Sequence, residues 1–337
     1  MTHPTDVDKY QVIRPLGSGH FGQVYQAFDR ALQTYKAIKI LRAKDPKEFL
    51  SHLKEGQILA RCRHKHIVAI NEANVFDVSG EQRVVLDLEY IPEGSLEGAL
   101  RDRWVSVREA ISYVRGALLG LEHAHSQGFL HRDIKPANIL LAPVGAKLSD
   151  FGLATDAGAS LFGSPRGYIT HLPPEYFADS STSALTDVFA TGMTLYRAVA
   201  NINDWRAVSG SVPNCRMHVE AGTLIKQLGY AEFVPGCVRR IISKACHPDS
   251  SKRYQSAQEF GQKLDKLRFG IDWVRIGDVS WRGLSGNDIY EAMVEEKSRT
   301  LTVTKNKRKV TALCRPFASL AEAISALDSH VAETTFA

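Results

Sequence analysis

The feature that most constrains this sequence is a cluster of polar residues near the middle of the chain: Asp133, Lys135, Asn138 and Asp150. Pro136 prevents the segment from continuing as a helix, so we expect a loop there. The set suits phosphoryl transfer, which needs a carboxylate to orient the attacking hydroxyl, a cation beside the phosphate and oxygen ligands for magnesium. Asp133 would orient the hydroxyl, and Lys135 would neutralise the phosphate. Asn138 and Asp150 would bind the metal.

Composition predicts a globular protein with one large two-lobed domain or two ordinary domains, because the chain has 337 residues and 44% of them are hydrophobic. The net charge of +5 is modest and does not by itself imply nucleic-acid binding. The five cysteines form no CxxC pair, which favours a reducing compartment over a disulfide framework or a zinc site. We see no secretory signal and no apolar stretch of membrane-spanning length, and therefore expect a soluble, cytoplasmic protein.

The periodicity of apolar residues predicts a small β-rich part followed by a larger helical part, which is an α+β organisation. Alternating β-branched and aromatic residues indicate antiparallel strands, at 10–41 and 84–91. Apolar residues at helical spacing indicate amphipathic helices. One predicted helix ends at Arg61, and the others cover 108–128, 188–200 and 257–267.

A glycine-rich segment, Gly17-Ser18-Gly19-His20-Phe21-Gly22, fits the pattern GxGxxG. Alone this pattern is weak evidence for any one fold, because dinucleotide-binding folds also contain it. A dinucleotide-binding turn must open a helix, whereas residues 24–28 read as a strand, so we expect a flap between two antiparallel strands that covers phosphates. An ordinary glycine-rich hairpin turn is the alternative.

Lys39 lies on the next predicted strand, where its ammonium group could reach nucleotide phosphates. Glu55 lies on the following predicted helix and shares a helical face with Leu59, so it is the natural counter-ion. An exposed surface lysine is the usual alternative, and the neighbouring motifs favour the site.

In this order, the motifs resemble those of eukaryotic-type Ser/Thr protein kinases over about residues 10–269. The further matches are a hinge at Leu88-Glu89-Tyr90-Ile91, Pro173-Pro174-Glu175, Asp187 and Arg253. The resemblance implies a bilobal protein-kinase fold, with an N-lobe at about 10–91 and a C-lobe at about 92–269. It also implies transfer of the ATP γ-phosphate to Ser or Thr hydroxyls of protein substrates, with Mg²⁺, since Lys135 two residues after Asp133 is the Ser/Thr form.

The resemblance further assigns residue roles. Asp133, Lys135, Lys39 and Glu55 would be catalytic. Glu175 would pair with Arg253 to anchor the substrate loop, and Asp187 would hold the backbone around His131, although a plain helix N-cap is its simpler explanation. Leu59, Ile70, His131 and Phe151 would stack as a spine between the lobes. The nucleotide would be bound by Leu16, Gly17, Ser18, Gly19, Gly22, Val24, Ala37, Lys39, Glu89, Ile91 and Leu140.

Two departures from the family pattern concern the segment after Asp150. The interval from Tyr168 to Glu175 is longer than usual, so peptide specificity cannot be carried over from the family. Arg132 precedes the catalytic Asp133, a form in which phosphorylation of this segment is common in the family, but Thr155 stands five residues after Asp150, where regulated members often have a basic residue. We therefore expect autophosphorylation at Ser160 or Ser164, with Arg132 receiving the phosphate.

Residues 270–337 have a different pattern and predict a small α+β appendage. We expect short strands near Trp273 and Trp281, a helix at about 287–296, a hairpin that turns at 305–308 and a last helix around 320–331. The appendage could recruit a substrate, regulate the kinase or bind nucleic acid through the seven basic residues between 297 and 315. Nucleic-acid binding is disfavoured because nine acids balance nine basic residues over the whole appendage.

Two other functions compete with a protein kinase. A pseudokinase that serves as a scaffold or nucleotide sensor is disfavoured because Lys39, Glu55, Asp133, Asn138 and Asp150 are all present. A small-molecule kinase on the same fold is disfavoured by Glu175, Asp187 and Arg253, which the family uses to build a platform for protein substrates.

Overall fold

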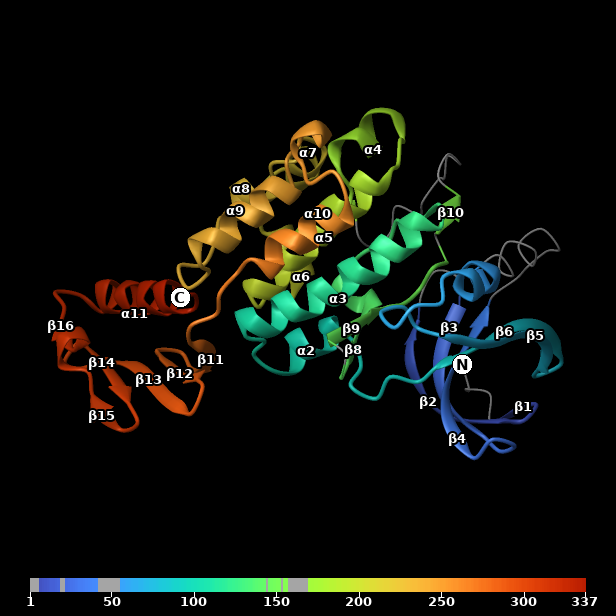
Figure 1. Ribbon diagram of the computed structural model, residues 1–337, viewed down its shortest axis with the longest axis horizontal. Coiled ribbons are helices and arrows are strands. Elements are labelled where there is room, and N and C mark those ends of the chain that lie inside the picture. Colours follow the sequence, from blue (N-terminus) through green and yellow to red (C-terminus); the bar gives the residue numbers. More distant parts are fainter. Residues whose placement is uncertain (1–5, 19–21, 42–54, 144, 153, 157–168) are drawn as a thin grey trace.

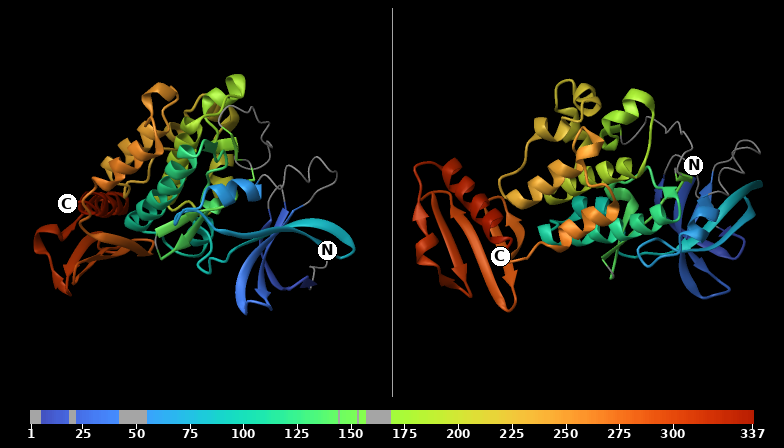
Figure 2. Two further views of the ribbon diagram at one scale, coloured as in Figure 1. Left: turned by 45° about the vertical axis from the view of Figure 1, so that its right-hand side comes forward. Right: turned by 45° about the horizontal axis from the view of Figure 1, so that its top comes forward.

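The computed structural model describes residues 6–18, 22–41, 55–143, 145–152, 154–156 and 169–337. Gly19, Ser160 and Ser164 lie outside the described residues. A twisted sheet forms one end of the molecule, a helical lobe forms the middle, and a second sheet covered by one helix forms the other end (Figure 1). Two further views show the same order of the three parts (Figure 2).

The N-terminal sheet is antiparallel, with strand order β1-β2-β3-β4-β6-β5. Its strands are β1 Asp6–Val7, β2 Tyr10–Ser18, β3 Gly22–Asp29, β4 Thr34–Leu41, β5 Ile70–Val78 and β6 Glu81–Glu89. The predicted strands at 10–41 and 84–91 are thus confirmed. A glycine is required at position 22, where β3 pairs with β4, because a Cβ there would lie 2.3 Å from the Ile40 carbonyl oxygen. Residues 55–61 are helical and lead into β5.

The helical lobe is built around α5, Ala184–Val199, which is buried along nearly its whole length. Helix α3, Val107–Ser126, packs beside α5, and it begins with a reciprocal capping box between Ser106 and Glu109. The predicted helices at 108–128, 188–200 and 257–267 correspond to α3, α5 and α10. The other helices are α2 Leu96–Asp102, α4 Pro174–Asp179, α6 Trp205–Gly210, α7 Cys215–Glu220, α8 Leu224–Leu228, α9 Gly236–Ala245 and α10 Ala257–Asp265.

The C-terminal part is an antiparallel sheet with α11, Leu320–Thr334, packed on one face. Its strands are β11 Asp272–Gly277, β12 Ser280–Ser285, β13 Asp288–Glu295, β14 Thr300–Lys305, β15 Arg308–Lys309 and β16 Arg315–Pro316. The predicted strands near Trp273 and Trp281, and the predicted last helix, are confirmed. We call residues 270–337 the C-terminal module.

The predicted helix at 287–296 is wrong, because these residues form β13, which pairs with β12 on one side and β14 on the other. Along β13 burial alternates: Ala292 and Val294 are buried, whereas Met293 is exposed. The predicted hairpin does turn at 305–308, but its second strand is only Arg308–Lys309. A 3₁₀ helix, η4 Thr311–Leu313, replaces the rest of that strand.

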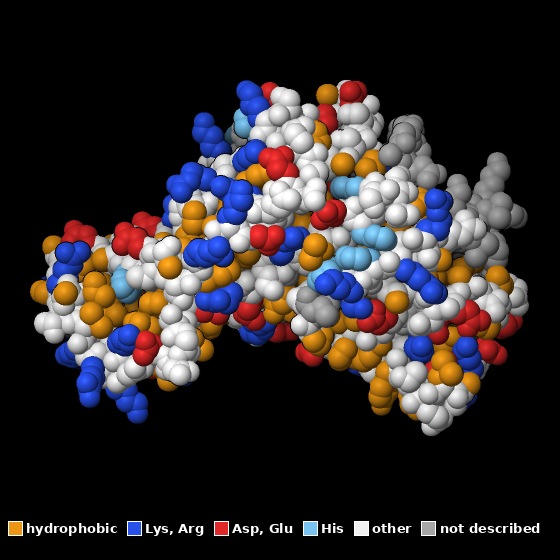
Figure 3. All heavy atoms as spheres, in the orientation of Figure 1, with side chains coloured by type: hydrophobic (Ala, Val, Ile, Leu, Met, Phe, Trp, Pro, Cys, Tyr) orange, Lys and Arg blue, Asp and Glu red, His pale blue; other side chains and the backbone are white. Residues whose placement is uncertain are grey.

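Lys and Arg side chains protrude at the tip of the C-terminal module around β14 and β15, while acidic side chains gather above them over α11 (Figure 3). Lys305 pairs with Asp288 at 2.7 Å and lies over the ring of Tyr290. This mixture of charges agrees with the neutral balance of the module in the sequence and gives no continuous basic surface on this face.

The C-terminal module packs directly on the helical lobe through aromatic rings. Trp281 of β12 is buried and meets Trp104 edge to face, with 5.0 Å between ring centroids, and Phe233 at 5.2 Å. The last residues return to the start of the module, where Gly270 N–H donates to Thr335 O at 2.9 Å. The module is therefore joined to the lobe by a packed seam and not only by the connecting chain.

No helix among the described residues combines the length and the apolar character needed to cross a lipid bilayer.

Truncation of the seam should weaken the attachment of the module. Trp281→Ala removes a fully buried indole, so we expect a loss of about 3–5 kcal/mol in the free energy of unfolding of the module and its seam, measured by denaturant titration. Leu284→Ala, an exposed residue on the same strand, is the matched control and should change stability by less than about 0.5 kcal/mol. Equal stabilities of Trp281→Ala and wild type would contradict the role of the seam.

Candidate active site

The loop that carries Asp133 is held by one buried carboxylate. Asp187, in the first turn of α5, accepts hydrogen bonds from the backbone N–H groups of His131, at 2.9 Å, and Arg132, at 2.7 Å. These bonds stabilise a left-handed backbone at Arg132, with φ of 66°. Asp150, on the neighbouring loop, also has a positive φ, of 61°. Such conformations are costly for residues other than glycine and are concentrated at functional sites.

The structure brings Asp133, Lys135 and Asn138 together. Lys135 Nζ donates to Asp133 Oδ2 at 2.5 Å. Asn138 Nδ2 donates to the same oxygen at 3.0 Å and to the Asp133 carbonyl at 2.8 Å. These bonds use the nitrogen of the Asn138 amide, and the amide oxygen, which a magnesium ion would take, lies outside them. Residues 131–134 form neither helix nor strand, in agreement with the expected loop, and Pro136 then begins the short 3₁₀ helix η1, Pro136–Asn138, to which Asn138 belongs.

Lys39 joins the two lobes at the site. Its Nζ lies 2.7 Å and 3.0 Å from the two carboxylate oxygens of Glu55, and 2.6 Å from Asp150 Oδ1. Lys39 and Glu55 are both buried. Glu55 comes from the helix of the N-lobe, whereas Asp150 follows β9, Gly145–Leu148, of the C-lobe. The predicted counter-ion of Lys39 is therefore present, together with a second carboxylate.

Burial and charge set the protonation of these groups. Burial alone would lower the pKa of Lys39, but the carboxylates of Asp150 and Glu55 raise it above the usual value, so the side chain stays an ammonium ion. Burial alone would raise the pKa of Asp150, but Lys39 lowers it, so Asp150 stays ionised. Burial raises the pKa of Asp133, although Lys135 opposes the shift. A carboxylate with a raised pKa is a better proton acceptor for a hydroxyl group.

The oxygen donors suit a magnesium ion. Asp150 offers a carboxylate and Asn138 an amide oxygen, which are the hard ligands that Mg²⁺ prefers, and phosphates and water complete its octahedron in phosphoryl-transfer sites. No larger cluster of His, Cys, Asp or Glu that could hold a metal is found in the part of the chain that the structure describes. The residues present thus fit magnesium bound together with a phosphate group.

The predicted spine residues lie in the core behind the site. Leu59, Ile70 and Phe151 belong to one buried apolar cluster. His131 meets the Phe151 ring at 4.6 Å between centroids, and its Nε2 lies 3.0 Å from the Ser149 carbonyl oxygen. His131 is completely buried, which agrees with the packing role predicted for it.

Three of the residues predicted to bind adenine or phosphate share one face of the N-terminal sheet. Ala37 and Lys39 are two apart on β4, and Val24 pairs with Lys39 across β3. Leu140 lies on β8, Ile139–Ala142, in the C-lobe. Leu16, Gly17 and Ser18 form the exposed end of β2.

The predicted hinge positions have additional contacts. Glu89 ends β6, and both of its carboxylate oxygens lie 2.7 Å from Lys147 Nζ of β9. The Ile91 carbonyl accepts a hydrogen bond from Gly94 N–H at 3.3 Å. Lys147 was not expected from the sequence, since a lone lysine on a short strand gives no signal.

The predicted contact between Glu175 and Arg253 is present and bidentate, with distances of 2.6 Å and 2.8 Å. Arg253 is buried and also donates to three backbone carbonyls, so it ties the start of α4 to the segments beside α5. A bidentate pair of this kind fixes orientation as well as distance.

One residue of this framework was missed by the sequence analysis. His125, near the end of α3, lies 2.8 Å from Asp187 Oδ2 through its Nε2. Its spacing from the polar cluster, six residues before His131, carries no chemical signal by itself, and only the fold brings it to α5.

Comparisons with known proteins agree with this geometry. A model of the protein kinase domain matches residues 10–263, about three quarters of the chain. Serine/threonine-protein kinase PknJ of Mycobacterium tuberculosis is 29% identical over 276 residues, which are 77% of this chain and 46% of the relative.

Two further relatives carry the same kind of name. PrkC of Bacillus subtilis is 27% identical over 323 residues, 89% of this chain and 48% of the relative. PknB of Mycolicibacterium smegmatis is 28% identical over 281 residues, 80% of this chain and 45% of the relative. The chain spans about half the length of the curated relatives it matches. Because the family model covers well over half of the chain, this chain belongs to the protein kinase domain family.

Proposed function

We propose that this chain transfers the γ-phosphate of ATP to Ser or Thr hydroxyls of protein substrates, and that it also phosphorylates itself. The observation that carries the proposal is the double ion pair of Lys39 with Glu55 and Asp150, since the two lobes contribute its members. An inactive relic of the fold would have no need to keep three buried or half-buried charges in register.

The residues would divide the work as follows. Lys39 would bind the α- and β-phosphates, oriented by Glu55. Asp133 would orient the hydroxyl and accept its proton, while Lys135 would neutralise charge on the transferred phosphate. When bound, magnesium would screen the phosphate charge, with Asn138 and Asp150 as its protein ligands.

The nucleotide would lie under the N-terminal sheet. Leu16, Val24, Ala37 and Leu140 would pack on adenine, and the backbone of Glu89 and Ile91 would meet its polar edge. The glycine-rich segment of Gly17, Ser18, Gly19 and Gly22 would cover the phosphates, because glycines let backbone N–H groups approach oxygen closely.

We further propose that residues 10–269 act as the kinase domain and that the C-terminal module is a fixed extension of it, which recruits a substrate or a partner or regulates the kinase. Its mixed charge speaks against nucleic acid as that partner. We keep the cytoplasm as the proposed location, on the cysteine pattern of the sequence.

Removal of the proposed proton acceptor should abolish transfer. Asp133→Asn keeps the hydrogen-bonding shape but cannot accept a proton, so we expect transfer to protein to fall by about 10²- to 10⁴-fold while ATP still binds. Labelled ATP and magnesium with a Ser/Thr peptide array provide the assay. Asp102→Asn, an exposed acid at the end of α2, is the matched control and should be active. Equal transfer by Asp133→Asn and wild type would refute the assignment.

Removal of the phosphate-binding cation should affect ATP. In Lys39→Met the hydrogen bond to phosphate is lost, so we expect kcat/KM for ATP to fall by about 10- to 150-fold or more, as for one bond to a charged group. Lys36→Met, on the same strand, is the control because Lys36 reaches Asp87 only at 4.0 Å. Steady-state kinetics at varied ATP concentration give kcat/KM for ATP in both variants, and only Lys39→Met should show the loss.

Autophosphorylation should mark Ser160 or Ser164. We expect mass spectrometry of wild-type protein incubated with ATP and magnesium to locate phosphate at one of them, with Arg132 as the cation that receives it. The Asp133→Asn protein should stay unmodified under the same conditions. Fully active protein without phosphate would contradict this proposal.

If wild type binds ATP but phosphorylates neither itself nor any peptide, a scaffold or nucleotide sensor becomes the better explanation. Phosphate transfer to a small molecule alone would favour a small-molecule kinase on the same fold.

A further inference from the structure

The segment just before Pro173 forms a single 3₁₀ turn, η2 Ile169–His171, in the loop that is longer than usual for the family. This turn contacts α5, the helix whose Asp187 also holds the backbone of the loop that carries Asp133. Burial, together with the charges of Arg197 and Lys135, lowers the pKa of His171 well below its usual value. On the proposed kinase function, the turn belongs to the segment between Asp150 and Glu175 that faces a protein substrate.

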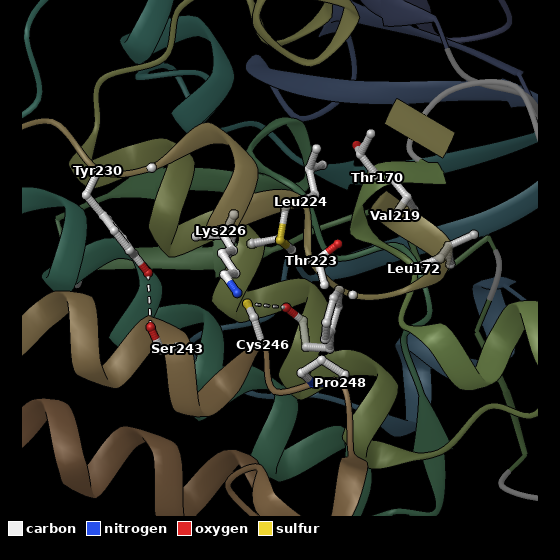
Figure 4. Close-up of a pocket in the computed structure, with 15 residues that line it drawn as sticks. Thr170, Leu172, Val219, Thr223, Leu224, Lys226, Tyr230, Ser243, Cys246 and Pro248 are labelled. Atoms are coloured by element: carbon white, nitrogen blue, oxygen red, sulfur yellow. Dashed lines mark hydrogen bonds between the residues drawn. The ribbon is translucent and has the colours of Figure 1, made fainter. Parts of the chain in front are cut away.

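One face of this turn borders a cavity. Thr170 and Leu172 line a cavity of about 480 Å³, whose other walls come from α5, from the segment around α7 and α8, and from α9 (Figure 4). The labelled side chains of Val219, Thr223 and Leu224 lie around the same space in Figure 4. An open cavity provides no packing, so the turn must be held from another direction.

Trp205, the first residue of α6, provides that support. Its indole Nε1 donates to Thr170 Oγ1 at 2.8 Å, and its ring meets the His171 ring edge to face at 5.9 Å. Trp205 is 5% exposed, and α6 is itself capped by Asp204, whose side chain accepts from Ala207 N–H. A buried tryptophan normally finds a partner for its N–H, and here the partner is the substrate-facing turn.

The indole is itself fixed from behind. The guanidinium of Arg197 on α5 lies over the Trp205 ring, with 5.2 Å to the centroid. Arg197 is completely buried, and its Nη2 donates to both carboxylate oxygens of Glu97 on α2 at 2.8 Å and 2.9 Å. Among the described residues its Nε and Nη1 have no hydrogen-bond partner, so the Trp205 ring face adds to what Glu97 provides for this buried charge.

We infer that Trp205 is a positioning residue for the protein substrate: through its bond to Thr170 it fixes the 3₁₀ turn at 169–171, while Arg197 and Glu97 fix Trp205. This inference rests on the proposed kinase function. The ring and the N–H of Trp205 contact Thr170, His171, Tyr196 and Arg197, none of which is a predicted catalytic or nucleotide-binding residue. We therefore expect its loss to change where the substrate lies and not the chemistry of transfer.

The kinetic test uses the full chain and a peptide that wild type phosphorylates, chosen from a Ser/Thr peptide array. Trp205→Phe and Thr170→Val each remove one half of the hydrogen bond and keep most of the volume. We expect each to raise KM for the peptide by about 2- to 12-fold, the worth of one hydrogen bond, with kcat and KM for ATP within about twofold of wild type. The double variant should be no worse than either single variant.

Two matched variants should behave as wild type. Thr170→Ser keeps the hydroxyl acceptor, and Trp104→Phe makes the same chemical change as Trp205→Phe at the seam of the C-terminal module. An unchanged KM for the peptide would overturn the inference. It would also be overturned if KM for ATP and kcat were impaired as much as KM for the peptide.

Hydrogen exchange gives a readout that does not depend on catalysis. We expect the backbone amides of residues 169–172 to exchange faster in Trp205→Phe than in wild type and in Trp104→Phe. Unchanged exchange in this segment would overturn the inference, even for a variant with altered kinetics. A wild-type chain that phosphorylates no peptide would contradict the proposed function alone, since exchange still decides whether Trp205 fixes the turn.

Discussion

The buried carboxylate of Asp187 supports the rest of the site. It accepts the N–H groups of His131 and Arg132 and contacts His125, so one side chain on the central helix fixes the backbone from which Asp133 projects. Burial alone would raise the pKa of Asp187, but the hydrogen bonds from His125 and from the His131 backbone keep it below the usual value. Its contribution to stability is therefore complete at neutral pH and is lost as pH falls through the lowered pKa of the folded state.

An ion pair between Lys39 and Asp150 connects the two lobes. Lys39 lies on the N-terminal sheet, and Asp150 follows a C-lobe strand. Their 2.6 Å contact therefore fixes the position of one lobe relative to the other. A lysine held between two carboxylates has its charge and position set before any phosphate arrives, which lowers the reorganisation needed on binding. Arg253 likewise connects segments that are far apart in the chain, through its bidentate ion pair with Glu175.

Sequence reasoning succeeded where periodicity or motif spacing was strong. The strands within 10–41 and β6, together with α3, α5 and the cluster around Asp133, follow from local patterns, whereas β5 was not predicted. It failed at 287–296, because Ile289 and Met293 are four residues apart, which fits one face of a helix as well as one face of a strand, and only pairing with β12 and β14 decides for a strand. It also could not find His125, Lys147 or Trp205, whose partners lie far away in sequence and are brought near only by the tertiary fold.

The seam of the C-terminal module has a practical consequence for shortened versions of this protein. Phe269 and Phe336 pair across it, and Ala337 N–H donates to Arg268 O, so the module begins and ends at one place. A cut at that place would remove the module cleanly but would uncover Trp104 and Phe233, leaving an apolar aromatic surface open to water. Self-association of such a fragment would then reflect this new surface and not the loss of a regulator.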